Sequence, residues 1–364
     1  MPAVPVSAVT DQSAVVLTAI INKLQKPSTF LYNILYRNAP VRYMETGQYQ
    51  IDIKNGVANI APLTRTDGEA KMLTRGTGDV KNGTLPNIRM KMPISYNEDL
   101  YKRLPGMISG GGLIRPGEAS YFMKVVAETI SADAQNMLDA WWRRQEWFAA
   151  KLLAGAVSYS DTDGTNFAID LERPVGNTST PGTKWNDDAC TPRKDMVALK
   201  LLASTAQTSL RLGICNDNMA NKLLASVEAG QLKWDEDNLK NTYGTNTTIV
   251  NHIFKGMDED FDSVYLGRLG GVEVWCYNGV DLDDGTTPFV PNDTIRCFNP
   301  STRSRIIMYA PIPKATTKGI QLVRTRKLSW AKPKDDPVSF VQYLESREFP
   351  FETRADWVFD IVPY

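Results

Sequence analysis

Few side chains in this chain of 364 residues could carry catalysis. Serine and cysteine nucleophile systems and multi-histidine metal sites all need a histidine that other groups hold in place. The chain has a single histidine, His252, within the largely apolar run 249–254, so it could build at most one such site. These neighbours favour a partly buried structural imidazole over a catalytic one.

Two stretches that resemble ligand-binding loops are better explained as turns. The run 281–285 reads Asp-Leu-Asp-Asp-Gly, like the start of a calcium loop, but Asn292 stands where such a loop needs a bidentate glutamate. The glycine-rich stretch 76–83 suggests a phosphate loop, but no Gly-Lys-Ser/Thr sequence opens a helix there. We therefore interpret them as a tight turn and a hairpin tip, and predict no catalytic residue, no metal site and no cofactor.

The composition is that of a globular protein without a strong charge. Lys and Arg number 41 and Asp and Glu also number 41, and 42% of residues are hydrophobic, which excludes a disordered chain. A dedicated nucleic-acid-binding protein usually carries a basic excess, and here there is none overall. The four cysteines form no C-x-x-C pair and indicate reduced thiols in a cytosolic protein. No run approaches 18 uncharged apolar residues, which predicts no membrane span.

Charge is nevertheless unevenly distributed along the chain. The segment 301–334 has nine basic residues and no acidic one, whereas 256–284 has eight acidic residues and one basic residue. Opposed blocks of this kind could pair head to tail between copies of the chain. They could equally be two solvated faces, because exposed ion pairs contribute little. A nucleic-acid groove formed by 301–334 is a weaker possibility, since few aromatic residues are interleaved with its charges.

The elements that would position these groups include one very long helix. Between residues 117 and 155 apolar side chains recur at spacings of three, four or seven, which predicts a helix with one buried stripe that ends near Gly155. The stripe consists of Phe122, Val126, Ile130, Met137, Trp141, Phe148 and Leu152. Trp142 and Trp147 lie off it, so we expect a second surface of this helix to be covered as well.

Two segments before the helix predict extensions from the body of the protein. Residues 1–56 resemble an arm with one short helix near 10–24, and its apolar residues must pack on something else. In 57–95, glycines and charged residues precede an alternation at Ile88, Met90, Met92 and Ile94. We predict a long two-stranded hairpin there, which needs a neighbouring surface because isolated hairpins are marginally stable.

Short strands and two helical patterns follow the long helix, and three local motifs resemble one known family. These motifs are the helix end Glu146–Gly155, the run Gly271–Gly279 followed by Phe289–Thr294, and Ser346–Pro350. Together, and in this order, they resemble the lambda-type major capsid protein E family of tailed bacteriophages. The likeness extends from about Tyr49 to the end, while residues 1–48 cannot be matched individually.

The resemblance implies an α+β tailed-phage capsid fold. Its expected parts are an N-terminal arm (1–56), an extended β-hairpin or E-loop (57–95), a peripheral domain (96–190) with a spine helix at 117–155, an α/β axial domain (191–309) and C-terminal strands that return to the peripheral domain (310–364). It also implies a structural protein and no enzyme. Copies would form hexamers and pentamers of an icosahedral shell enclosing double-stranded DNA, assembled in the host bacterial cytoplasm.

By the same analogy the partners are other copies of the chain, a scaffolding protein, a portal and a decoration protein, with only weak contact to packaged DNA and no membrane. The predicted subunit-interface residues are Arg65, Lys71, Arg75, Lys81, Arg89 and Lys91 in the hairpin, Asp258, Glu259, Asp260 and Asp262 in the acidic block, and Arg324, Arg326 and Lys327 in the basic block. Two other functions stay open at this point. One is a nucleic-acid-binding module that uses 301–334, and the other is a ligand-binding or enzyme domain with the hairpin as a lid.

Overall fold

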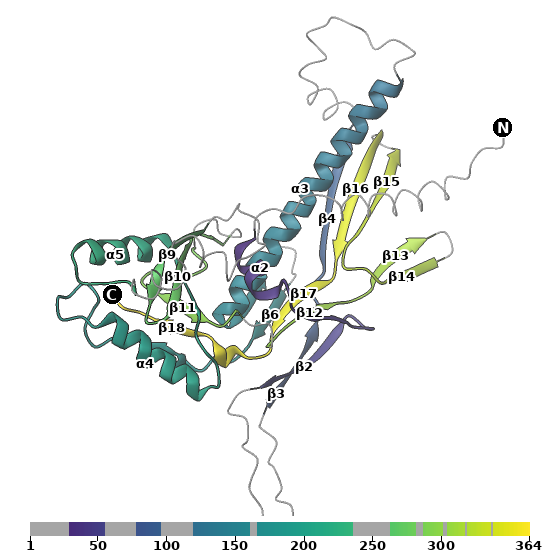
Figure 1. Ribbon diagram of the computed structural model, residues 1–364. Coiled ribbons are helices and arrows are strands. Elements are labelled where there is room, and N and C mark those ends of the chain that lie inside the picture. Colours follow the sequence, from purple (N-terminus) through teal and green to yellow (C-terminus); the bar gives the residue numbers. More distant parts are fainter. Residues whose placement is uncertain are drawn as a thin grey trace, which may run out of the picture.

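A long central helix separates two groups of strands in this protein (Figure 1). The computed structural model describes residues 29–54, 78–95, 119–160, 166–235, 263–281, 287–300, 304–316, 319–335 and 338–364. On one side of the helix lies a sheet with two helices packed on it. On the other side lie a three-stranded sheet and several hairpins. The predicted mixture of α and β structure is confirmed.

The central helix, α3, spans Ala119–Ala154, and its 36 residues give it a length of about 54 Å. The predicted stripe is buried where its burial is described, at Met137, Trp141, Phe148 and Leu152. Trp142 and Trp147 are also buried, at 4% and 2% exposure, so the expected second covered surface is confirmed. Gly155 follows the helix with a φ of 100°, a left-handed conformation that glycine adopts without strain.

The helix-covered sheet has six strands. Their order is β7 (Thr178–Ser179), β18 (Phe359–Ile361), β11 (Ile295–Phe298), β8 (Leu212–Cys215), β10 (Val272–Tyr277) and β9 (Ser263–Leu269). Alternate residues of β10 belong to two different cores: Val274 packs with helices α4 (Pro192–Thr205) and α5 (Asp217–Glu228), whereas Trp275 packs with α3. Each face of the sheet is therefore buried against a different layer.

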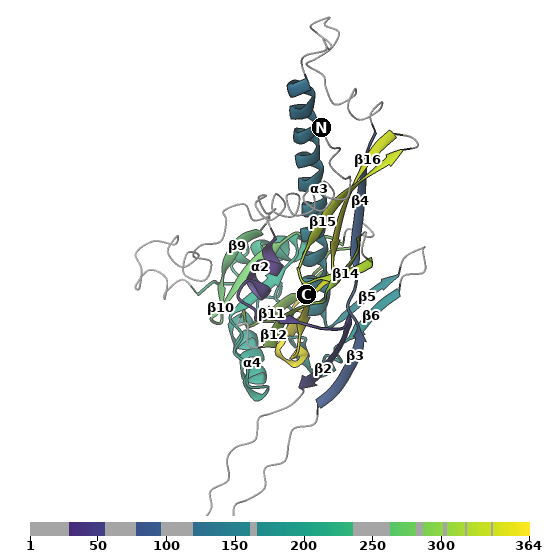
Figure 2. The same cartoon turned by 90° about the vertical axis from the view of Figure 1, so that its right-hand side faces the viewer.

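The second group of strands begins with a three-stranded antiparallel sheet along the central helix. Its order is β15 (Leu328–Asp335), β16 (Val338–Ser346) and β4 (Ile88–Ser95). Two views at right angles both place β4 and β16 beside α3 (Figures 1 and 2). A further sheet contains β1 (Val41–Tyr43), β12 (Arg305–Tyr309) and β17 (Glu348–Glu352) and contacts α3 through β17.

The predicted hairpin at 57–95 is wrong in its strand pairing. Its two strands are β2 (Gln48–Lys54) and β3 (Gly78–Thr84), which pair from Gln48 opposite Thr84 to Lys54 opposite Gly78. The alternating segment is the predicted strand, β4, but it pairs with β16, about 250 residues further on. Pro86 lies between β3 and β4, which belong to two different sheets. Alternation reveals a buried face and says nothing about which strand lies alongside.

The N-terminal apolar cluster forms the short helix α2 (Phe30–Tyr36), six of whose residues are buried. Phe30 stacks on Tyr277 of β10 at 5.1 Å between ring centroids, and Tyr32 meets Trp142 of α3 edge-on at 5.5 Å. The expectation that this cluster packs on another surface is confirmed, and that surface belongs to the same chain. The helix predicted near 10–24 lies outside the described residues.

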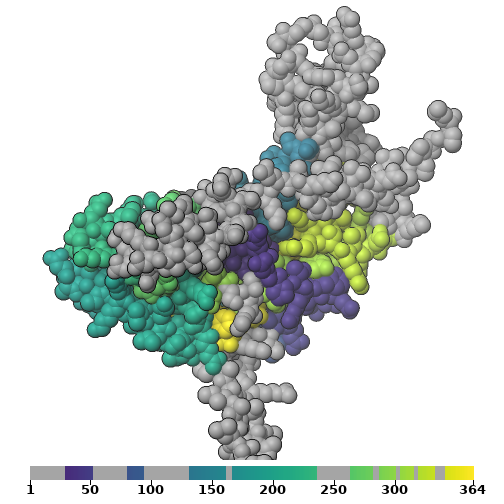
Figure 3. Space-filling view, in the orientation of Figure 1, coloured from purple at the N-terminus to yellow at the C-terminus, as the bar shows by residue number. Residues whose placement is uncertain are grey.

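Two more hairpins complete the described structure. The hairpin β5 (Ala156–Ser160) to β6 (Asn166–Asp170) follows α3 directly, and β13 (Ile312–Thr316) to β14 (Gly319–Val323) follows β12. In the space-filling view the teal and green residues of the helix-covered sheet form one body, and the lime residues of the C-terminal half lie on the opposite side beside purple N-terminal residues (Figure 3).

Candidate subunit-interface residues

Six of the thirteen predicted interface residues lie in the part of the chain that the structure describes. The others fall in 55–77 and 236–262, outside the described residues. They are Arg65, Lys71, Arg75, Asp258, Glu259, Asp260 and Asp262. The six described residues all come from the two basic sets, and the structure distributes them over β3, β4 and the segment between β14 and β15.

The hairpin residues differ in what they contact. Lys81 of β3 pairs with Glu172, which anchors the β2–β3 hairpin to the segment that follows β6. Arg89 of β4 lies 3.6 Å from the carboxylate of Glu345 on β16. Lys91, two residues further along β4, is exposed and lies on the same side of the sheet as Arg89.

Two of the C-terminal basic residues lie over aromatic rings of their own chain. The guanidinium of Arg324 is 4.8 Å from the ring centre of Tyr43 on β1, and the ammonium of Lys327 is 4.5 Å from that of Trp141 on α3. Such cation–π contacts hold a chain segment on an aromatic surface. Arg324 and Lys327 therefore attach the segment between β14 and β15 to the core.

Of the six described residues, Arg326 has the most extensive hydrogen bonding. Its guanidinium binds both carboxylate oxygens of Glu348, whose side chain is fully buried. The hydroxyl of Tyr32 on α2 donates to the same carboxylate at 3.0 Å. Burial, reinforced by the negative charge of Glu348, raises the pKa of Tyr32 well above its ordinary value, so the hydroxyl keeps its proton and remains a donor. This set joins α2, β17 and the basic segment.

These contacts weaken the nucleic-acid interpretation of 301–334. In that block Arg324, Arg326 and Lys327 contact partners inside the subunit, and Arg305 is buried beside Glu352 at 2.7 Å. Cations held in this way are not arranged along an open groove for a phosphate backbone. The uneven charge in the sequence is explained in part by buried and half-buried pairs.

A buried carboxylate that the sequence did not reveal joins three elements. Glu146 lies on the C-terminal half of α3 and accepts the backbone N–H groups of Leu31 and Tyr32, each at 2.7 Å. It also accepts the hydroxyl of Tyr277 on β10 at 2.7 Å. Burial raises the pKa of Glu146, and the hydrogen bonds from Tyr277 and from the backbone of Phe30, Leu31 and Tyr32 act in the opposite direction by stabilising the charge. The carboxylate thus caps α2 and ties it to α3 and to the six-stranded sheet.

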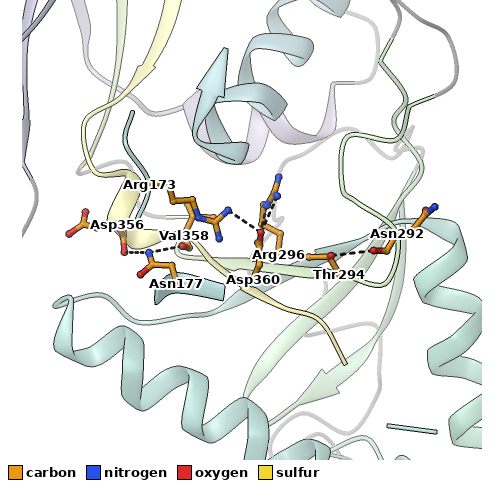
Figure 4. Close-up of polar contacts among 8 residues, drawn as sticks. All are labelled: Arg173, Asn177, Asn292, Thr294, Arg296, Asp356, Val358 and Asp360. Atoms are coloured by element: carbon orange, nitrogen blue, oxygen red, sulfur yellow. Dashed lines mark hydrogen bonds and ion pairs between the residues drawn. The ribbon is translucent and has the colours of Figure 1, made fainter. Parts of the chain in front are cut away.

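A second buried network holds the C-terminal strand β18 in the six-stranded sheet (Figure 4). Asp360 binds Arg296 of β11 through two hydrogen bonds of 3.0 and 3.1 Å, and accepts a third from Arg173 at 3.0 Å. Nearby, the amide of Asn177 donates to the carbonyls of Asp356 and Val358. Burial opposes the charge of Asp360, but the two guanidinium groups outweigh it and hold the pKa of this carboxyl below its usual range.

Asp281, the first residue of the acidic run 281–285, has a structural role. Asp281 accepts the indole N–H of Trp147 at 2.8 Å and pairs with Lys151 at 2.7 Å, both on α3. Residues 282–286 and His252 lie outside the described part. Within the described ranges, no group of three or more His, Cys, Asp and Glu side chains is placed to hold a metal ion, and the four cysteines are free.

Comparison with known proteins finds a matching family and similar solved structures. A family model described as phage major capsid protein E matches residues 13–336. The chain is similar to the solved structure of a putative capsid protein of a prophage of E. coli CFT073, with a TM-score of 0.63, 14% identity and coverage of 97% of this chain and 99% of that chain. It also matches the capsid of Ralstonia phage GP4, with a TM-score of 0.49, 13% identity and coverage of 93% and 88%. A comparison with curated proteins finds no match.

The similarity to the prophage protein concerns the fold and spans nearly the whole of both chains. It agrees with the fold expected from the sequence resemblance, an α+β capsid fold with a long helix. In the described residues no helix has the length and apolar character of a membrane span.

Proposed function

Because the chain belongs to the phage major capsid protein E family, we propose that its copies assemble into the hexamers and pentamers of an icosahedral shell that encloses double-stranded phage DNA. Family membership itself makes the protein a capsid protein whose copies form the shell of a phage particle. The observation that carries the proposal is the extent of the family match, residues 13–336, which includes the central helix and most of the strands on either side of it.

Unpaired strand edges in the described residues support an assembled state. Three of the sheets in the described residues, β2–β3, β5–β6 and β13–β14, have two strands each. Hairpins of this kind gain independent stability when a further strand, a helix or another chain covers them. The β2–β3 hairpin points away from the body, opposite to the N-terminal end of α3 (Figure 1). We assign it to a neighbouring copy, with the basic residues Arg65, Lys71 and Arg75 of 55–77 at the contact, and we propose Lys91, on the exposed side of β4, as a separate contact.

The two groups of strands support a division of the subunit into two domains. We propose that 191–309 form an axial domain around each capsomer centre and that 96–190 with 310–364 form a peripheral domain. The six-stranded sheet of this axial region also contains β7 and β18, which lie outside 191–309. These two strands form one edge of the sheet and come from the peripheral segments 96–190 and 310–364. The Asp360, Arg296 and Arg173 network lies at this junction.

Electrostatics fit a container for DNA. A shell of many strongly basic copies would bind packaged DNA tightly and resist its movement, whereas this chain has a formal net charge of zero. We therefore expect only weak contact with the DNA. A scaffolding protein, a portal and a decoration protein are the further partners we propose, and the host bacterial cytoplasm is the proposed place of assembly.

The test is to express the chain in bacteria with and without a candidate scaffolding protein, and to examine purified material by negative-stain electron microscopy. Closed particles of uniform diameter would support the proposal. Material that stays monomeric at high concentration in both preparations, with or without the scaffolding protein, would contradict it.

A further inference from the structure

We propose that the outward face of the β13–β14 hairpin is a contact surface for a second copy of this chain. The proposal deepens the proposed function and rests on it. We define the hairpin face by three residues whose side chains share one side of the two strands, Pro313, Ile320 and Leu322. In the backbone register Leu322 lies opposite Pro313, and Ile320 is two residues before Leu322 on β14.

The two sides of this hairpin are unlike each other in burial. On the inner side Ile312 is fully buried and packs with Leu328 and Trp330 in a small core. On the outer side Ile320 is 80% exposed and Leu322 is 60% exposed. Each side of the hairpin therefore carries apolar residues, and in the described part of the chain the inner Ile312 and Val323 pack in the small core while the outer Ile320 and Leu322 stay exposed.

Exposure of this apolar face to water is unfavourable for the β13–β14 hairpin. A two-stranded hairpin with a small inner core has little other stabilisation, and its unpaired edges with exposed Ile and Leu invite pairing with other chains. Natural edge strands usually carry charged side chains at such positions. Two large aliphatic side chains on one exposed face indicate a surface that is covered in the functional state.

The occupant that fits is another copy, held in a head-to-tail manner. The protein belongs to a family whose members form shells, so each copy is surrounded by others. The hairpin 312–323 carries two basic residues, Lys314 and Lys318, and no acidic one. Two hairpins meeting face to face around a twofold axis would bring these like charges together, so the partner surface is a different and more acidic part of the neighbour.

The position of the hairpin agrees with such a contact. It lies on the opposite side of α3 from the six-stranded sheet (Figure 1). Its base is fixed: Ile312 is buried in the small core, and Arg324, directly after β14, lies over Tyr43. A face presented on a fixed base loses little conformational freedom when a neighbour covers it.

The first test is a pair of substitutions with a matched control. Ile320→Thr combined with Leu322→Thr retains residues that favour strands while removing the apolar contact. Val175→Thr changes an aliphatic residue that is 92% exposed on a short turn elsewhere. We expect the double variant to lower the yield of closed particles at a fixed protein concentration by at least about tenfold. We expect the control to assemble like the wild type, and both variants to melt as isolated subunits within about 2 °C of it.

The second test identifies the occupant without relying on yield. A photoreactive benzoylphenylalanine replaces Ile320, and particles are assembled from a mixture of nitrogen-14 and nitrogen-15 subunits. Crosslinked peptides that join a light copy to a heavy copy are the expected result. Crosslinks confined to one copy, to another protein or to DNA would overturn the inference, as would full particle yield from the double variant. If the wild type itself forms no particles, the proposed function fails and this inference fails with it.

Discussion

The carboxylate of Glu146, on the C-terminal half of the central helix, accepts the hydroxyl hydrogen of Tyr277 on strand β10 at 2.7 Å. The same carboxylate accepts two backbone N–H groups at the start of α2. Three elements that belong to different parts of the sequence thus meet at one buried group. The relative placement of the N-terminal segment, the central helix and the six-stranded sheet depends on it.

Replacing this group should destabilise the isolated subunit. Glu146→Ala leaves the buried donors of α2 and Tyr277 without an acceptor, and we expect the free energy of unfolding to fall by about 3 kcal/mol. Glu146→Gln should also destabilise, because its amide nitrogen would place a donor against a backbone N–H. Urea unfolding measures both changes. Glu228→Gln, an exposed change on α5, is the control, and an unaltered midpoint for Glu146→Ala would show that the carboxylate is not a structural acceptor.

The network around Asp360 predicts a dependence of stability on acidity. Its pKa in the folded protein lies below the unfolded value, so the stabilisation is present above the unfolded pKa of about 3.9 and is lost as the pH falls through the folded pKa. Asp360→Asn removes the acceptor of two guanidinium groups and should cost about 3 kcal/mol at pH 7.

Stability profiles between pH 7 and pH 2.5 check this account. The wild type should lose more stability than Asp360→Asn on acidification, since the variant has already lost the contribution that titrates. Parallel profiles for the two proteins, with the same decrease at low pH, would assign the acid sensitivity to other carboxyl groups.

Two of the predicted interface residues should behave differently from each other. Arg326→Ala leaves the buried Glu348 without its cation and should cost the isolated subunit about 3 kcal/mol. Lys91→Ala changes an exposed side chain on β4 and should alter subunit stability by less than about 0.5 kcal/mol. Thermal melting of subunits, followed by assembly of each variant, separates the two effects. A drop in melting temperature for Lys91→Ala, with none for Arg326→Ala, would reverse the assignment.

The register of the β2–β3 hairpin allows residues 55–77 to be removed without changing the pairing of the two strands. Lys54 and Gly78 are opposite each other at the end of the ladder, so a two-residue Asn-Gly turn can replace residues 55–77 and close the hairpin. We expect a folded subunit that forms no closed particles, measured by circular dichroism and sedimentation. A second variant, in which 55–77 become a Gly-Ser chain of equal length, tests whether sequence or length matters. Normal particles from the Asn-Gly variant would remove the segment from assembly.

The central helix could be predicted from the sequence because its signal is local. The recurring apolar residues from Met137 to Leu152 need only the geometry of one helix to be interpreted, and Gly155 marks the end. Alternation at Ile88, Met90 and Met92 likewise predicts the strand β4. The error there was the partner, because pairing with β16 depends on residues far along the chain.

The buried polar contacts could not be predicted for the same reason. Glu146 follows two arginines and a glutamine in the sequence, and polar neighbours of this kind give no indication that the carboxylate is buried. Its backbone partner Leu31 is 115 residues away and Tyr277 is 131 residues away. Arg326 was predicted as an interface residue from its basic neighbours, and its engagement with Glu348 inside the subunit depends on the folded arrangement of β17 and α2.

The most direct test of the central claim is a cryo-electron microscopy reconstruction of the purified assembled protein. We predict a closed shell in which five and six copies surround local axes, with the six-stranded sheets nearest those axes and each β2–β3 hairpin lying on an adjacent copy. A discrete small oligomer, or a particle in which every hairpin folds back on its own subunit, would contradict the account.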